Sequence, residues 1–180
     1  MIPTEQQCYD LMEQYQMLDN IREHSIVVAE ISRVISSGLV ASGVELSVEK
    51  AVAGALLHDI GKTQCLQTGG DHAALGRNIC LQHRFDEIAD IVAEHIWLRD
   101  YSPDGVYEEK EIVYYADKRV LHSSVVRLEE RKRYIIGTYA RKNHKLRRLI
   151  SENFNICREV EKKLFNKLGF GPQDLVGLVG

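Results

Sequence analysis

Hydrophobic residues recur along most of this chain at intervals of three and four positions, which is the period of an α-helix with one buried face. No segment shows the sustained alternation of apolar and polar residues that is typical of a half-buried strand. Capping residues and glycines divide the pattern into helices at residues 4 to about 18, 20 to about 40, 48–57, a short helix from 71, 86 to about 98, 108–121, 124 to about 142, and 145–168. We therefore expect an all-α fold, a helical bundle with additional helices at its C-terminal end.

Length and composition bound the domain organisation. The 180 residues are 44% hydrophobic and include no internal repeat or disordered linker, so one domain spanning 1–180 is expected. The four cysteines form no CxxC pair and the N-terminus lacks the features of a signal peptide, which indicates a cytoplasmic setting. No stretch approaches the roughly 18 apolar residues of a membrane span. A net charge of -3 gives no general attraction to nucleic acid or to membranes.

Several expected helices direct a titratable side chain towards the core. His24 occupies a position in an otherwise aliphatic stripe, and His58 and Asp59 directly follow the apolar run 52–57. His95 ends a stripe that begins at Ile88, and Asp117 follows the hydrophobic run 112–116. Burying such groups unpaired costs several kcal/mol, roughly, and a divalent cation can pair with all of them.

Each residue also has a structural interpretation. His24 alone can be a core histidine that is hydrogen-bonded to a carbonyl, and Lys118 or Arg119 can pair with Asp117 in an ordinary salt bridge. Taken together, the inward groups favour a metal site. Imidazoles and carboxylates without an inward thiolate suit one or two ions of Mn, Fe, Co, Ni, Zn or Mg.

The order of these residues resembles a known family. His24, the pair His58-Asp59, and Asp117 resemble the H…HD…D signature of the HD-domain superfamily of metal-dependent phosphohydrolases, and residues 58–62 read HDIGK. The resemblance covers roughly 22–121. It implies a helical bundle whose metal-site core spans about 20–122, with His24, His58, Asp59 and Asp117 as metal ligands. The basic C-terminal helices, about 124–168, lie outside it.

Some branches of this superfamily hold a second metal with additional histidines. Here His72 begins a segment similar to their HxxxG element, and His95 is similar to their later helical histidine. The resemblance therefore implies His72 and His95 as ligands of a second ion, whereas His83 is expected at the surface or at a helix end. Those branches include dinucleoside tetraphosphate hydrolases and HD-GYP cyclic-dinucleotide phosphodiesterases; the Gly-Tyr-Pro element of the latter is missing here.

The activity that the resemblance implies is metal-dependent hydrolysis of a phosphoester or phosphoanhydride bond, in a phosphorylated small molecule, nucleotide or dinucleotide, by a metal-activated water. Asp59 is the expected catalytic residue that orients this water. Lys62 is expected to be catalytic and to bind substrate phosphate, with Arg99 as a second substrate-binding residue. Trp97 and Tyr101 flank Arg99 and are candidates for stacking on a base.

Two alternatives stay open. HD-fold proteins with the additional histidines include di-iron oxygenases. In the other alternative the metal is structural, and the basic segment 127–148, with Tyr134 and Tyr139 interleaved, belongs to a non-catalytic module that binds nucleotides or RNA. The default interpretation of that segment is a solvated helix face, and the apolar residues beyond it can dock on the bundle or on a second subunit. The sequence does not identify the substrate or the metal.

Overall fold

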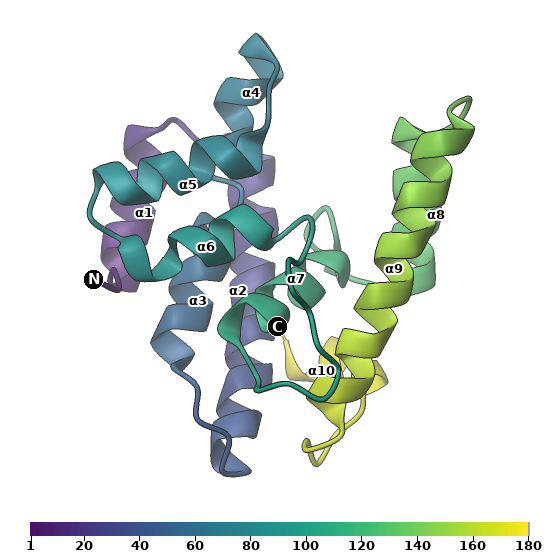
Figure 1. Ribbon diagram of the computed structural model, residues 1–180. Helices are drawn as coiled ribbons and strands as arrows, with labels where there is room; N and C mark the ends of the chain where they lie inside the picture. Colours follow the sequence, from purple (N-terminus) through teal and green to yellow (C-terminus); the bar gives the residue numbers. More distant parts are fainter. Residues whose placement is uncertain (180) are drawn as a thin grey trace.

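The computed structural model describes residues 1–179 and confirms the all-α prediction (Figure 1). Its elements are α1 (Glu5–Gln14), α2 (Asp19–Ala41), α3 (Val48–Leu57), α4 (Lys62–Thr68), α5 (His72–Gln82), α6 (Asp86–Glu94), α7 (Glu109–Lys118), β1 (Val120–Leu121), β2 (Ser124–Val125), α8 (Leu128–Tyr139), α9 (His144–Phe165), a 3-10 turn at Pro172–Asp174, and α10 (Leu175–Leu178).

The helix starts follow local hydrogen bonding. Thr4 forms the expected capping box with Gln7, and the Ser47 and Asp71 side chains accept backbone N–H groups at the starts of α3 and α5. The helix expected from residue 20 instead begins at Asp19, and its N-cap residue, Leu18, provides no side-chain cap.

Two segments differ from the sequence-based expectation. The expected helices left residues 58–70 outside helical structure, but Gly61 keeps a right-handed helical conformation, so the chain enters α4 and leaves helical geometry only at Gly69, where φ is +75°. Residues 120–125 were expected to end one helix and begin the next. They form a two-stranded antiparallel hairpin instead, in which Val120 pairs with Val125 and His122 adopts a φ of +56° at the turn.

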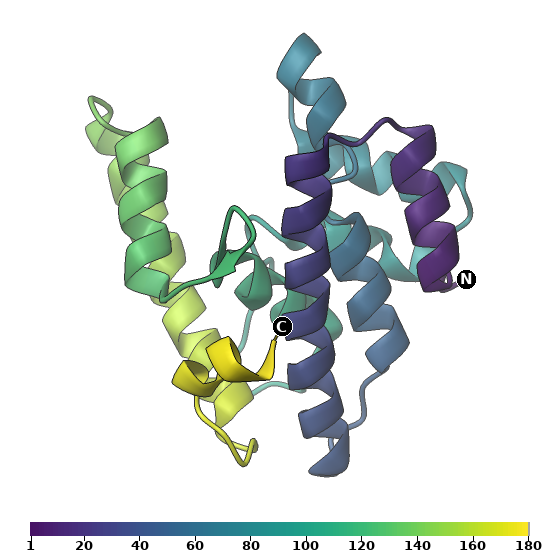
Figure 2. The same cartoon turned by 180° about the vertical axis from the view of Figure 1, so that it is seen from behind.

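The long helix α2 lies at the centre of the bundle and packs on α3 and α7, while α6 packs on α3, α5 and α7 (Figures 1 and 2). The residues of α2 that the sequence predicts to face the core, including His24, are buried. Contrary to the expectation from the sequence, α2 is long and apolar enough to cross a membrane, with a mean hydropathy of 1.3. Half of that stretch is buried inside the protein, as in the core helix of a globular domain.

The C-terminal helices dock on this bundle through α9. The Tyr114 hydroxyl of α7 donates to the backbone and side-chain oxygens of Asn153 on α9, at 2.8 and 2.6 Å. Nearer the end of α9, the buried Lys163 ammonium donates to the Glu111 carboxylate at 2.7 Å and to two carbonyls of the loop before α7. In contrast, α8 packs mainly on α9 and less extensively on α7, and residues of α4 and α8 line opposite sides of an open cavity (Figures 1 and 2).

Glycines permit a close approach of α4, α5 and α6 next to this opening. A Cβ on Gly61 would lie 2.6 Å from the His72 carbonyl oxygen and 2.9 Å from the Gly76 amide nitrogen. A Cβ on Gly76 would lie 2.8 Å from a methyl carbon of Val92 in α6. Because two of these neighbours are backbone atoms, no side-chain rotation can make room at Gly61. The Gly of the HDIG motif therefore fixes the position of the N-terminus of α5.

We predict that Lys163→Met lowers the free energy of unfolding by about 3 kcal/mol, because it leaves the buried Glu111 carboxylate without its cation. Adding Glu111→Gln should recover part of the loss. The exposed neighbour Lys162 pairs only with Glu159 on its own helix, so Lys162→Met should change stability by less than about 0.5 kcal/mol. Urea unfolding measures the stability of all three variants. Equal losses in Lys163→Met and Lys162→Met would contradict a stabilising role of the buried Lys163–Glu111 pair.

We also predict that Gly61→Ala lowers the free energy of unfolding by about 1–3 kcal/mol, because α5 must move away from its backbone contact. Gly137 in α8 is the matched control, since a Cβ there meets nothing within 4 Å. Gly137→Ala should be neutral or slightly stabilising. Unfolding midpoints that shift alike in both variants would show that Gly61 is not required for the close approach.

Candidate metal centre

The candidate ligands converge on the floor of the opening from separate helices. They are His24 of α2, His58 and Asp59 at the end of α3, His72 at the start of α5, His95 at the end of α6, and Asp117 of α7. Asp59, His58 and His95 are almost completely buried, as is His24. The structure therefore brings together all the metal-ligand candidates that the sequence predicts, and it keeps His83 away, at the end of α5, where its Nε2 lies 3.3 Å from the Tyr15 hydroxyl.

Backbone carbonyls orient the buried imidazoles. The Nδ1 atoms lie 3.0 Å from the His122 carbonyl oxygen for His24, 2.7 Å from that of Ala55 for His58, and 2.7 Å from that of Val92 for His95. A neutral imidazole carries one N–H, and here Nδ1 must donate it, since a carbonyl only accepts. Each Nε2 then presents a lone pair to the centre, as in histidines that ligate metals.

These Nε2 atoms face carboxylate oxygens. The His24 Nε2 lies 3.0 Å from Asp117 Oδ1, and the His58 Nε2 lies 3.5 Å from Asp59 Oδ2 and 3.8 Å from Asp117 Oδ1. On the other side of the same carboxylate, Asp59 Oδ1 lies 3.2 Å from the His72 Nε2 and 3.6 Å from the His95 Nε2. Lone pairs that face each other repel unless a proton or a cation lies between them.

The arrangement fits a divalent cation. Within residues 1–179, His58 Nε2 and Asp59 Oδ1 are buried without a hydrogen-bond partner. Potential ligand atoms within 4.8 Å of one another form two groups, one of His24, His58 and Asp59 and the other of Asp59, His72 and His95. Asp59 belongs to both groups, so the geometry accommodates two ions on either side of one carboxylate.

Charges around the centre keep both carboxylates ionised. Burial by itself raises the pKa of Asp59, but His58, His72 and His95 outweigh it and hold the pKa well below its usual range. For Asp117, burial likewise acts to raise the pKa, but the contact with the His24 imidazole and the charges of Lys118 and Arg131 lower it well below the usual range. Burial lowers the pKa of His95 and so favours the neutral ligand form. Burial also acts to lower the pKa of His58, but the Asp59 and Asp117 carboxylates outweigh it and raise this pKa, so a divalent cation must displace a proton from His58 when it binds.

The structural alternatives for Asp117 account for little of its environment. The Lys118 ammonium donates to the carbonyls of His95 and Tyr114, at 2.9 and 3.2 Å, and lies 3.9 Å from Asp117. It therefore ties the end of α6 to α7. The Arg119 guanidinium points elsewhere, to the carbonyls of Val126 and Pro172.

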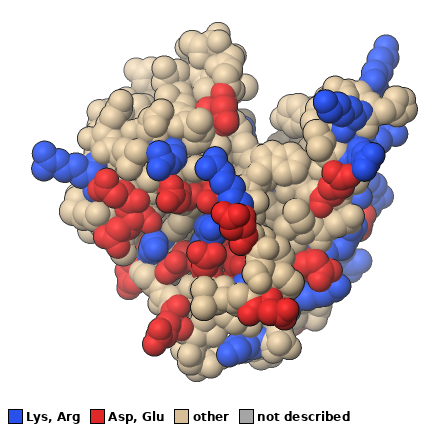
Figure 3. All heavy atoms as spheres, viewed as in Figure 1, with Lys and Arg blue, Asp and Glu red and all other residues tan. Residues whose placement is uncertain are grey.

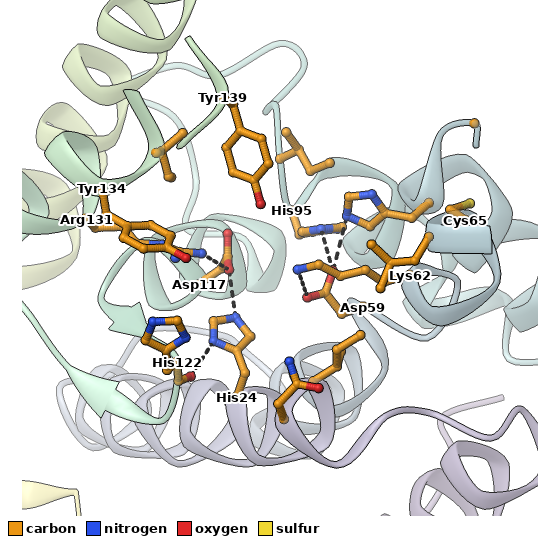
Figure 4. A pocket seen from close by; sticks show the side chains of 17 residues that line it. His24, Asp59, Lys62, Cys65, His95, Asp117, His122, Arg131, Tyr134 and Tyr139 are labelled. Atoms are coloured by element: carbon orange, nitrogen blue, oxygen red, sulfur yellow. Dashed lines mark hydrogen bonds and ion pairs between the residues drawn. The ribbon is translucent and has the colours of Figure 1, made fainter. Parts of the chain in front are cut away.

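A cavity of about 560 Å³ opens above the centre (Figure 4). Lys62 lines it and donates to Asp59 Oδ2 at 2.6 Å, with its side chain 34% exposed. Arg99 does not line it: its side chain is exposed, its backbone N–H donates to Glu94, and Trp97 and Tyr101 also lie outside the cavity lining. The substrate-binding interpretation of Arg99 therefore finds no support in the geometry.

The wall opposite Lys62 comes from the basic C-terminal part. Its residues are His122 of the hairpin turn and Arg131, Tyr134, Ile135 and Tyr139 of α8. From the sequence, Tyr134 and Tyr139 were expected only in a basic segment that could bind nucleotides or RNA, and none of these residues was expected beside the metal centre. The available signal is their spacing, because positions 131, 134, 135 and 139 lie on one face of a helix.

Known proteins are similar to the central part of this chain, which contains the candidate metal ligands. The family model described as "HD domain" matches residues 21–120. A tRNA (cytidine(56)-2'-O)-methyltransferase of Thermoplasma volcanium is 36% identical over 106 residues, which are 58% of this chain and 29% of that protein. A Ribonuclease Y of Mycoplasma mycoides is 42% identical over 69 residues, which are 38% of this chain and 15% of that enzyme.

The chain thus covers less than a third of the length of these two relatives. An uncharacterised protein of Methanocaldococcus jannaschii is 28% identical over 127 residues, which are 62% of this chain and 73% of that protein. The search of solved structures gives no match. Because the family model covers more than half of the chain, including the ligand residues from His24 to Asp117, this protein belongs to the HD domain family.

Proposed function

We propose that this protein is a metal-dependent phosphohydrolase that cleaves a phosphoester or phosphoanhydride bond of a nucleotide, with two divalent ions that share Asp59. The observation that carries the proposal is the buried Asp59 carboxylate, whose two oxygens face separate groups of imidazole lone pairs. His24, His58, Asp59 and Asp117 would hold one ion, and Asp59, His72 and His95 the other. Mn, Fe, Co, Ni and Zn suit these nitrogen-rich ligands better than Mg.

Bound divalent ions would lower the pKa of a coordinated water and offset the charge of phosphoryl oxygens. The protein's own residues complete the site. Asp59, ionised and held between imidazoles, can orient the attacking water. The Lys62 ammonium is anchored on Asp59 at 2.6 Å, while part of its side chain faces the cavity, so it can donate to a phosphoryl oxygen without leaving that anchor.

Two considerations favour a nucleotide over other phosphorylated substrates. The relatives include enzymes named Ribonuclease Y and a tRNA methyltransferase, and RNA is a nucleotide polymer. The cavity also combines cationic groups, Lys62 and Arg131, with apolar and aromatic walls, which matches a ligand that carries both phosphate and base.

A di-iron oxygenase would use similar nitrogen and carboxylate ligands. The cationic Lys62 at the shared carboxylate favours hydrolysis, because an ammonium stabilises negative charge that develops on a phosphoryl group. Iron content together with oxygen consumption and no phosphate chemistry would favour the oxygenase.

We predict that the Mn-loaded protein retains about two ions per chain after dialysis, and that His72→Ala retains about one. His83, at the other end of α5, is the matched control, so His83→Ala should retain both ions. Elemental analysis measures the ratio. A single ion in the wild type, or two ions in His72→Ala, would contradict the shared-carboxylate arrangement.

We predict that the wild type with Mn hydrolyses at least one member of a panel of mononucleotides, cyclic dinucleotides, dinucleoside polyphosphates, guanosine tetraphosphate and short RNA. Asp59→Asn should abolish this turnover, and Lys62→Met should lower kcat/KM by about 100-fold, because each removes a charge at the reacting group.

The control is Lys162→Met, at an exposed lysine far along α9, which should keep the wild-type rate. Initial rates of phosphate or nucleoside release are measured. Full activity in Asp59→Asn, or no turnover by folded, metal-loaded wild type, would refute the proposal.

A further inference from the structure

We propose that α8 is the nucleotide-recognition wall of this cavity: Arg131 binds a phosphate beside the metal centre, and Tyr134 and Tyr139 stack on the base. The inference rests on the proposed function and specifies how its substrate is recognised. The ligand is a nucleotide, either free or at the end of an RNA strand.

Arg131 has hydrogen-bonding capacity that the fold leaves unused. Its side chain is 14% exposed, and its Nε is buried without a hydrogen-bond partner within residues 1–179. Its nearest acid is Asp117, whose Oδ1 lies 3.8 Å from Nη2, which is beyond hydrogen-bonding distance. A guanidinium with free donors next to a candidate metal centre is suited to bidentate binding of phosphoryl oxygens.

The two tyrosines continue the same helix face along the cavity. The Tyr134 ring packs edge-on against His122, with ring centroids 5.5 Å apart, and the Arg131 guanidinium lies 6.0 Å from its centroid. Tyr139 also lines the cavity, and its hydroxyl end points towards the centre (Figure 4). It is 66% exposed, so packing does not explain its orientation. Aromatic faces beside an arginine are the usual platform for a base of a single-stranded nucleotide.

The packing of α8 separates this wall from the structural core. Leu128 is its one buried residue, and the helix contacts α9 and the edge of α7. Side chains on the cavity face are therefore available for a ligand. A volume of about 560 Å³ lies in the range of cavities that enclose small organic ligands.

Positive charge extends beyond the cavity on the α8–α9 arm (Figure 3). Arg141, Lys142, Lys145, Arg147 and Arg148 are all exposed near its tip. These residues can follow a phosphate backbone that continues outside the cavity, which makes the end of an RNA strand one of the two sources of the nucleotide.

The test compares two chromogenic phosphodiesters that differ in the presence of a base: the p-nitrophenyl ester of thymidine 5′-monophosphate and bis(p-nitrophenyl) phosphate, both with Mn. Selectivity is the ratio of their kcat/KM values. Tyr134→Ala and Tyr139→Ala should each lower it about tenfold through lost stacking. Arg131→Met should lower kcat/KM for both esters by about 100-fold, because both contain the phosphate.

Matched controls separate this wall from the rest of the surface. Trp97→Ala removes an exposed aromatic outside the cavity, and Arg133→Met removes a neighbouring arginine whose Nε donates to the Glu129 carbonyl on α8. Both should keep the wild-type selectivity. Unchanged selectivity in both tyrosine variants, or a loss in Trp97→Ala, would overturn the proposal.

A binding measurement separates this inference from the proposed function. If the wild type hydrolyses neither ester and no member of the nucleotide panel, the proposed function fails, whereas calorimetric binding of AMP to the Mn-loaded protein, weakened about tenfold in Tyr134→Ala, still supports the recognition wall. No binding of AMP to the wild type overturns the wall.

Binding of a short single-stranded RNA, measured beside that of AMP, distinguishes a free nucleotide from the end of an RNA strand. Arg147→Ala combined with Arg148→Ala should weaken RNA binding and reduce its dependence on salt concentration if a strand is bound, and should leave the binding of both ligands unaffected if the nucleotide is free. Either result is consistent with nucleotide binding at α8. An equal loss of AMP and RNA binding would instead mean that the ligand binds at the tip of the arm, and would overturn the proposal.

Discussion

The Asp59 carboxylate is 1% exposed and lies among the imidazoles of His58, His72 and His95 and the ammonium of Lys62. A buried carboxylate is costly unless cations or donors surround it. Backbone carbonyls accept hydrogen bonds from Nδ1 of His58 and His95, so in their neutral forms these rings turn the Nε2 lone pairs towards the acid. Divalent cations would satisfy both sides at once. The ends of α3 and α6, with the negative ends of their helix dipoles, also lie at the centre and favour positive charge there.

The molecule divides its tasks between two parts of the chain. The part that matches the HD domain, residues 21–120, supplies every candidate metal ligand and Lys62. The hairpin at 120–125 then reverses the chain, and α8 returns along the opening while α9 anchors it to α7. Chemistry would thus reside in the shared bundle and recognition in the part outside the family match. In such an arrangement, substitutions in the α8–α9 arm can change which substrate is bound while the metal centre stays the same.

The sequence contained enough information for the centre and too little for its surroundings. His24 and Asp117 could be predicted because each occupies an inward position of a regular apolar stripe, and helical phase alone gives that direction. The role of Arg131 depends on where the hairpin directs α8, which is a tertiary property, and in the sequence Arg131 belongs to an ordinary basic helix face. Arg99 was expected at the site because it follows the helix that carries His95, but α6 ends at Glu94, and Arg99 is exposed outside the cavity lining. The cytoplasmic location remains a prediction.

The most direct test of the account is anomalous X-ray diffraction from crystals of the protein grown with Mn. The account predicts two anomalous peaks on either side of the Asp59 carboxylate, one next to His24, His58 and Asp117 and the other next to His72 and His95. Two results would contradict the claim that Asp59 shares two metal ions. One is a single peak that does not contact Asp59. The other is the absence of any peak, with the imidazoles hydrogen-bonded directly to the carboxylates.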